Sequence, residues 1–204
     1  MINQMTKFVL AILILSSTSL ALADHHAAPT SAALEAYFCN FEKGKDMDDL
    51  LKVAAEWDKW VDVNQSNDYA AYVLRPVIST AADFPYDYFW LGVSKNHETM
   101  GQGADEWMEN GGKLAAKFDA VAPCDTHILM TSQTVKPYIS SGKSGFAQIS
   151  ACELNDDASM ESLMGADQKW VSWMTENDMP GGLSRWYGGV GEARDSTTDF
   201  YTVY

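Results

Sequence analysis

The sequence has few basic residues, few cysteines and, beyond its N-terminal segment, no long apolar run. Its 14 Lys and Arg residues stand against 28 Asp and Glu, which gives a net charge of −14. Such a surface repels nucleic acid and anionic lipid, so we expect neither a nucleic-acid partner nor a membrane partner for the processed chain. An acidic surface also keeps an exported protein soluble, and by itself it identifies no substrate.

The longest apolar run is at the N-terminus, and it is too short to span a membrane. Lys7 precedes the run FVLAILIL (8–15), and Ala21-Leu22-Ala23 is a small-x-small site before polar Asp24. This pattern is typical of a secretory signal peptide, whereas a membrane-spanning helix needs about 20 apolar residues. We therefore expect a protein exported to the periplasm or the extracellular space. The alternative is an uncleaved membrane anchor.

Motifs of common catalytic centres are also missing. No nucleophile elbow, phosphate-binding loop, CxxC or HExxH occurs. His97 and His127 are the only histidines in the region expected to fold, and neither has a partner at metal-ligand spacing. We expect no cofactor. The alternative is a haem held by one of these histidines, although a lone histidine is more often a structural residue.

A metal site at the mature N-terminus depends on processing. Cleavage after Ala23 would make His26 the third residue of the mature chain. A histidine in third place, with the terminal amine and two backbone amides, can form a square-planar Cu(II) or Ni(II) site. The alternative is an unstructured polar start.

What the sequence does contain is a long repeat. At an offset of 113 residues, the segment MDDLLKVAAEWDKWV (47–61) aligns with MESLMGADQKWVSWM (160–174). Two tryptophans at identical spacing are not expected by chance, and self-similarity at a domain-sized period indicates a duplicated unit. The aligned pairs include Cys39 with Cys152, Leu50 with Leu163, Trp57 with Trp170 and Trp60 with Trp173.

The two copies show the same order of elements. In the first copy, Asp46 is a helix N-cap and the apolar residues of 47–61 follow helical spacing. A second helical region over 98–121 is broken at Gly111-Gly112, and strand-like segments are 35–41, 69–79, 86–95 and 126–135. The second copy has strand-like segments at 145–154, 183–193 and 199–204 and a helix over 160–176. The first copy is therefore β-α-β-β-α-β, and the second ends after β-α-β-β.

The β-α-β-β-α-β order is the ferredoxin-like signature. With the duplicated helix and the aromatic strands, the chain resembles the dimeric α+β barrel proteins, which include small monooxygenases of antibiotic biosynthesis and NIPSNAP-like proteins. The resemblance implies an α+β fold of two tandem ferredoxin-like units forming one barrel, the second unit being truncated. The expected parts are a signal peptide (1–23), a flexible segment (24–34), the first unit (35–138), a Ser/Gly linker (139–145) and the second unit (146–204).

In such folds a ligand cavity often lies between the helices and the sheet. Alternation along 86–95 predicts that Tyr86, Tyr88 and Trp90 share one face, whereas Tyr72 and Arg75 lie on opposite faces of their strand. These side chains form either an aromatic pocket with a polar anchor or ordinary core packing. The candidate ligand-binding residues are Tyr72, Arg75, Tyr88, Trp90, His97 and His127.

The odd number of cysteines is explained by the ferredoxin-like strand order, 4-1-3-2. The first and last strands of a unit are then antiparallel neighbours, which brings Cys39 and Cys124 together as a disulfide. Cys152 is the counterpart of Cys39, and its partner would lie in the part of the second unit that the repeat lacks. The alternatives are another pairing or three reduced, buried cysteines.

Two classes of function are open. The first is an exported protein that binds a small apolar ligand or a partner. The partner can be another copy of the chain, bound through the open edge of the second unit. The second is an oxidoreductase of the α+β barrel type, either cofactor-free or haem-dependent. The missing catalytic motifs favour the first class, because a fold alone does not imply a function.

Overall fold

The computed structural model of the protein describes residues 30–65, 68–138 and 145–204. The expected signal peptide, His26 and most of the expected linker lie outside these residues. Within them, no helix has the length and apolar character that a membrane crossing requires.

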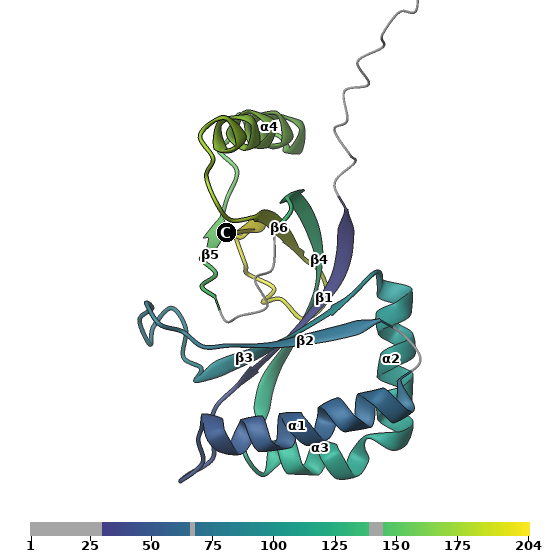
Figure 1. Ribbon diagram of the computed structural model, residues 1–204. Helices are drawn as coiled ribbons and strands as arrows, with labels where there is room; N and C mark the ends of the chain where they lie inside the picture. The colour runs from purple at the N-terminus through teal and green to yellow at the C-terminus, as the bar shows by residue number, and fades with distance from the viewer. Residues whose placement is uncertain (1–29, 66–67, 139–144) are drawn as a thin grey trace, which may run out of the picture.

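The described chain forms seven strands and four helices (Figure 1). In the first half these are β1 (Ser31–Cys39), α1 (Met47–Asn64), β2 (Tyr69–Leu74), β3 (Tyr88–Ser94), α2 (His97–Asn110), α3 (Gly112–Asp119) and β4 (Cys124–Lys136). The second half comprises β5 (Ile149–Cys152), α4 (Met160–Glu176), β6 (Leu183–Gly188) and β7 (Phe200–Val203).

Local capping sets where the two matched helices begin. The Asp46 carboxylate accepts hydrogen bonds from the backbone N–H groups of Asp48 (3.0 Å) and Asp49 (3.2 Å), which satisfies two free donors of the first turn of α1. At the equivalent place in the second copy, Ser159 and Ser162 form a capping box at the start of α4. The two helices therefore start at positions that the repeat aligns.

The second strand is shorter than the sequence predicts. β2 ends at Leu74, whereas the strand-like pattern extends to residue 79. Pro76 has no backbone N–H and disfavours regular pairing, and Arg75 directly before it is restricted as well. Residues 75 to 87 therefore form turns and bends between β2 and β3.

The strand order repeats between the two halves. All seven strands form one antiparallel sheet in the order β2-β3-β1-β4-β6-β7-β5. The first four have the ferredoxin-like arrangement, and β6-β7-β5 repeats the arrangement β2-β3-β1. The pairing of β4 with β6 joins the halves. The structure thus confirms the α+β class and the tandem ferredoxin-like units. Among the described residues, the second unit has no counterpart of α2, α3 or β4.

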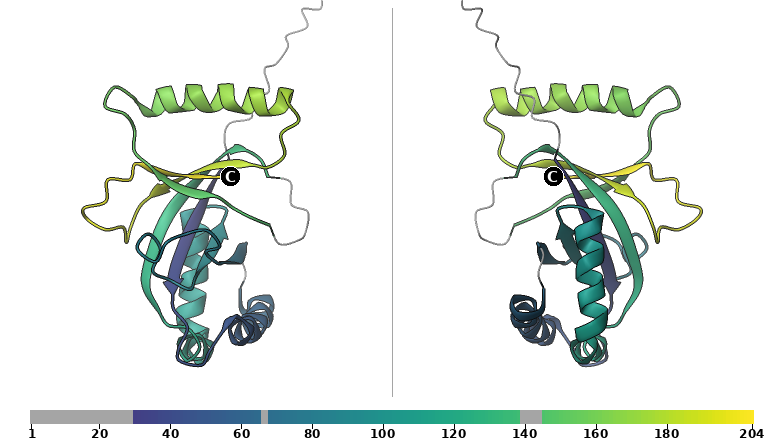
Figure 2. Two further views of the ribbon diagram at one scale, coloured as in Figure 1. Left: turned by 90° about the vertical axis from the view of Figure 1, so that its left-hand side faces the viewer. Right: turned by 90° about the vertical axis from the view of Figure 1, so that its right-hand side faces the viewer.

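The helices lie at the two ends of the molecule. α1, α2 and α3 gather against the first unit, whereas α4 stands alone over the strands of the second (Figure 1, Figure 2). One core fills the layer between the first unit's helices and its strands, around Leu50, Val53 and Tyr88. A second core lies on the opposite face of the sheet and combines residues of both units, such as Leu34 and Trp186.

One prediction about the sheet faces is wrong. β3 begins at Tyr88, so Tyr86 precedes the regular strand. The Tyr86 ring packs on Phe38 with ring centroids 5.3 Å apart, and its hydroxyl lies 3.0 Å from Thr126 Oγ1, on the face away from the helices. Tyr88 and Trp90 do share the helix-covered face. Alternation holds only within a regular strand, which explains the difference.

Candidate functional site

A polar network lies on the helix-covered face of the first unit, centred on Glu35 of β1. Glu35 Oε1 accepts a hydrogen bond from the Tyr69 hydroxyl at 2.6 Å, and Oε2 accepts one from the Tyr37 hydroxyl at 3.3 Å. His127 Nε2 lies 3.1 Å from the same Oε2. The carboxylate is buried, and a buried carboxylate needs such partners because an unpaired charge is strongly disfavoured.

The pairing of three strands brings these side chains together. Tyr37 of β1 lies directly opposite His127 of β4, and their rings stack with centroids 3.8 Å apart. Tyr69 comes from β2, across β3, where Gly92 leaves room for it. A Cβ atom at Gly92 would collide with the Tyr69 hydroxyl and with Glu35 Cγ. The network therefore depends on a glycine on the intervening strand.

Aromatic rings enclose the buried side of the network. The Trp90 indole N–H donates to the Tyr69 hydroxyl at 3.3 Å, and the Trp57 ring packs edge-on against both Trp90 (5.0 Å) and Tyr69 (5.8 Å). Phe118 of α3 packs on Trp90 at 5.5 Å. The network is thus closed toward the helices and reaches solvent through His127, whose side chain is 41 % exposed.

The tyrosines stay neutral donors in this setting. Burial, and next the neighbouring Glu35 carboxylate, raise the pKa of both Tyr37 and Tyr69 well above the ordinary value of 10.0. The two neutral phenols and the imidazole are thus the polar partners of the Glu35 carboxylate.

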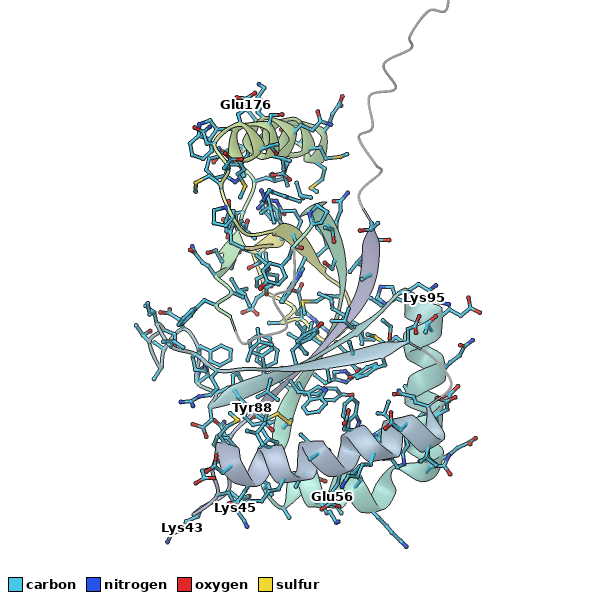
Figure 3. The ribbon with its side chains drawn as sticks, in the orientation of Figure 1. Lys43, Lys45, Glu56, Tyr88, Lys95 and Glu176 are labelled. Atoms are coloured by element: carbon cyan, nitrogen blue, oxygen red, sulfur yellow. A yellow bond between two sulfur atoms is a disulfide. The ribbon has the colours of Figure 1, made fainter. Side chains whose placement is uncertain are left out.

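The structure places the predicted candidate residues in different environments. Trp90 and His127 belong to the Glu35 network, while Tyr88 is a fully buried core residue between the sheet and α1 (Figure 3). Tyr72 and Arg75 are exposed, and Arg75 lies beyond the end of β2. The candidates therefore do not converge on one pocket, and their role in ligand binding remains a prediction.

Three members of the network were not predicted from the sequence: Glu35, Tyr37 and Tyr69. The segment AALEAYF (32–38) does contain the signal for one of them. Glu35 stands within an apolar strand, and a lone charge in such a strand indicates a buried and partnered carboxylate. No comparable signal identifies Tyr69 as its partner, because that contact requires the position of β2 relative to β1.

The residues present do not fit a haem. His97 Nε2 is hydrogen-bonded to Thr131 Oγ1 at 2.9 Å, and His127 Nε2 is engaged by Glu35. Two shallow surface depressions, one beside β2 and one along α4, include neither histidine in their linings. In the part of the chain that the structure describes, no three His, Cys, Asp or Glu side chains are placed to share a metal ion.

A different kind of site is formed by the second unit. Trp57 and Trp60 of α1 are half-buried: Trp57 packs on Trp90, and Trp60 packs edge-on against Trp107 of α2 at 5.0 Å. Their counterparts, Trp170 and Trp173 of α4, are 40 % and 44 % exposed. They stack on each other with centroids 4.9 Å apart.

The second unit also has an open strand edge. β5 is the last strand of the sheet, so its outer edge has no neighbour among the described residues. In the first unit, the equivalent edge of β1 pairs with β4. Ala166 is also exposed, although its counterpart Val53 is buried against α3 and the sheet core. We call Ala166, Trp170, Trp173 and the outer edge of β5 the α4–β5 surface.

The cysteines follow the predicted pairing. Cys39 at the end of β1 is bonded to Cys124 at the start of β4, and Cys152 carries a free thiol at the end of β5. The two equivalent sulfurs have the same local setting. Cys39 Sγ lies 3.4 Å from the carbonyl oxygen of Tyr37, and Cys152 Sγ lies 3.5 Å from that of Ser150.

A buried ion pair lies inside the second unit. The Arg185 guanidinium donates to both oxygens of Asp167 on α4 and to the Thr202 hydroxyl, and all three residues are buried. Phe200 packs under the guanidinium at 5.2 Å. This ion pair joins α4 to the sheet.

Comparison with known proteins shows a distant structural similarity. No protein-family model matches the sequence, and no curated protein sequence is significantly similar to it. Among solved structures, the chain is similar to one described as "Putative Chlorite dismutase TA0507", with a TM-score of 0.49 and 10 % sequence identity. The match covers 86 % of this chain and 79 % of that one. The ferredoxin-like assignment of the two units accordingly rests on their own strand order.

Proposed function

We propose that the protein is an exported binding protein that holds a protein partner on its α4–β5 surface. The observation that carries the proposal is the contrast between matched tryptophans. Trp57 and Trp60 are covered by α2, α3 and the strands of the first unit. Trp170 and Trp173, at the same positions of the repeat, are exposed. The first unit thus shows which contacts the tryptophan-bearing flank of the helix makes when a neighbouring helix is present.

The chemistry of the surface suits a protein partner. Tryptophan is enriched at binding hot spots because it buries a large area at a low cost in side-chain entropy. A free strand edge offers unpaired backbone N–H and C=O groups, and an added strand can pair with them. In the first unit, a helix followed by an antiparallel strand fills the same two positions, so we expect a partner that presents a helix and a strand.

Export is the second part of the proposal. The signal-peptide pattern supports it, and so does the Cys39–Cys124 disulfide, because such bonds persist mainly in oxidising compartments. N-terminal sequencing of protein recovered from the culture medium or the periplasm tests this part. We expect the sequence to begin at Asp24; recovery only in the cytoplasm with an intact Met1 contradicts it.

Site-specific photo-crosslinking tests the binding surface. A benzoylphenylalanine replaces Ala166 in one variant and Gln168 in a control, which is about 200° away around the same helix. We expect one specific cross-linked species from Ala166 in the native source and a much weaker one from Gln168. Mass spectrometry of the linked peptides then identifies the partner segment. Equal or absent cross-linking at the two positions would refute the proposal.

A further inference from the structure

We propose that the partner on the α4–β5 surface is a second copy of this chain. The two β5 strands would pair edge to edge around a two-fold axis at Cys152, and a disulfide between the two Cys152 residues would join the copies. This inference rests on the proposed function and names its partner. In the first unit, the equivalent edge is already paired and already disulfide-bonded.

The first unit supplies the template for the bond. Cys39 lies opposite Tyr88 on the inner neighbour β3 and opposite Cys124 on the outer neighbour β4, to which it is bonded. Cys152 lies opposite Phe200 on β7, the counterpart of β3. Cys152 therefore occupies the same strand position as Cys39, although its Sγ lies 3.3 Å from Thr202 Oγ1. An outer strand that brings a cysteine would complete the pattern of the first unit.

A second copy is the partner that provides this cysteine by symmetry. In an antiparallel pairing of two identical strands, a residue lies opposite itself only on the two-fold axis. Placing the axis at Cys152 puts the two thiols opposite each other. Because that axis is perpendicular to the sheet, the helix-covered faces of the two copies lie on the same side.

Backbone geometry on β5 agrees with this register. Gln148 and Tyr204 exchange both backbone hydrogen bonds, at 3.1 and 3.0 Å. Alternation then directs the N–H groups of Ser150 and Cys152 toward β7 and those of Ala151 and Glu153 toward the free edge. Across the new interface, Cys152 thus faces its counterpart as a non-hydrogen-bonded pair, in which side chains approach most closely. Ala151 and Glu153 of the two copies can exchange hydrogen bonds on either side of it.

The same pairing orients the exposed tryptophans. Trp170 and Trp173 lie on the flank of α4 that corresponds to the flank of α1 carrying Trp60, which packs on Trp107 of α2. In the paired sheet, these flanks of the two α4 helices face each other across the two β5 strands.

The covalent step requires an oxidant, and a small disulfide such as oxidised glutathione is sufficient. One Cys152 thiolate attacks it, forms a mixed disulfide and releases one glutathione thiolate. The Cys152 of the other copy then attacks the protein sulfur and releases the second. Two protein thiols and one small disulfide give one protein disulfide and two small thiols, and the two protons pass from the protein thiols to the released thiolates.

The experiment compares the full processed chain with two variants, in oxidised and in reduced glutathione. Non-reducing electrophoresis and peptide mapping detect the bond, and light scattering after gel filtration gives the mass. We expect a covalent dimer containing a Cys152–Cys152 peptide. Cys152→Ser should lose the bond but keep a weaker dimer, while Ala151→Pro should reduce dimer formation about tenfold or more, because it removes an outward N–H. Circular dichroism and an intact Cys39–Cys124 bond verify that each variant folds.

The outcomes separate this inference from the proposed function. A protein that stays monomeric in both redox conditions, or a dimer unaffected by Ala151→Pro, overturns the inference. If Ala166 then cross-links to a different protein, the binding function stands and only the identity of the partner is wrong. Each copy is strongly acidic, since the full sequence has a net charge of −14, so we also expect dimer formation to increase with salt concentration. A decrease with salt would count against the edge-to-edge arrangement.

Discussion

Tyr69 and Glu35 are joined across an intervening strand by a hydrogen bond of 2.6 Å between the hydroxyl and Oε1. β2 and β1 are not neighbours in the sheet, because β3 lies between them. The contact is possible only because β3 carries Gly92 at the crossing point. The bond therefore ties the edge strand of the first unit to its central strand and satisfies a buried carboxylate.

Removing the Tyr69 hydroxyl should destabilise the protein. Tyr69→Phe leaves Glu35 Oε1 without its closest donor, and a buried acceptor that loses its partner costs about 1–3 kcal/mol. Urea unfolding followed by circular dichroism measures the change. Tyr72→Phe is the matched control, because Tyr72 is on the same strand and 56 % exposed. A loss no larger than that of the control would mean that water replaces the hydroxyl.

Two Gly→Ala substitutions should have opposite effects. At Gly92 the added methyl collides with the Tyr69 side chain and with Glu35 Cγ, so Gly92→Ala should destabilise by about 1–3 kcal/mol. At Gly101, inside α2, the methyl meets nothing within 4 Å, and Ala favours the helix by about 0.5–1 kcal/mol. Thermal unfolding of the two variants checks the signs. Equal effects would mean that Tyr69 moves aside without cost.

Alkaline pH should weaken the fold through its buried tyrosines. Burial raises the pKa of Tyr88 to about 12, and the pKa values of Tyr37 and Tyr69 are raised as well. The unfolded chain releases these protons near pH 10 while the folded chain keeps them. Stability is thus highest below about pH 10 and falls as the pH rises toward about 12, by about 1.4 kcal/mol per pH unit for each tyrosine.

Urea midpoints at several pH values between 9 and 11.5 test this dependence. Tyr88→Phe should reduce the loss of unfolding free energy with rising pH by the contribution of one tyrosine. The stability of the variant at pH 7 is the reference, because the tyrosines are protonated there in both the folded and the unfolded chain. A decline of the same slope in Tyr88→Phe would show that Tyr88 does not contribute.

The sequence is sufficient for the fold because the fold repeats local patterns. The helical spacing of 47–61, the caps at Asp46 and Ser159, and the duplicated tryptophans predict both matched helices, and the strand order then predicts the Cys39–Cys124 bond. The candidate site was less predictable. The Glu35 network joins residues of four strands, so no local pattern contains it. The position of Tyr86 was predicted wrongly because the alternation was extended beyond the end of the regular strand.

The exposure of Trp170 and Trp173 could not be predicted from the sequence either. The repeat shows that these residues match Trp57 and Trp60, but not which of the four are covered. That difference depends on whether a helix lies beside α1 or α4, which is a property of the packed units. Similar sequence patterns thus have different surroundings in the two copies.

The buried ion pair between Arg185 and Asp167 leads to the last prediction. Arg185→Met leaves the Asp167 carboxylate buried without its partner and should cost about 3–5 kcal/mol. The double variant Arg185→Met/Asp167→Leu removes both charges, and we expect it to recover most of this loss, because apolar side chains can replace a buried pair at little cost. Denaturant unfolding of the single and double variants gives the two free energies. A double variant as unstable as the single one would show that α4 needs the ion pair itself for its position, and cross-linking from Ala166 should then be lost as well.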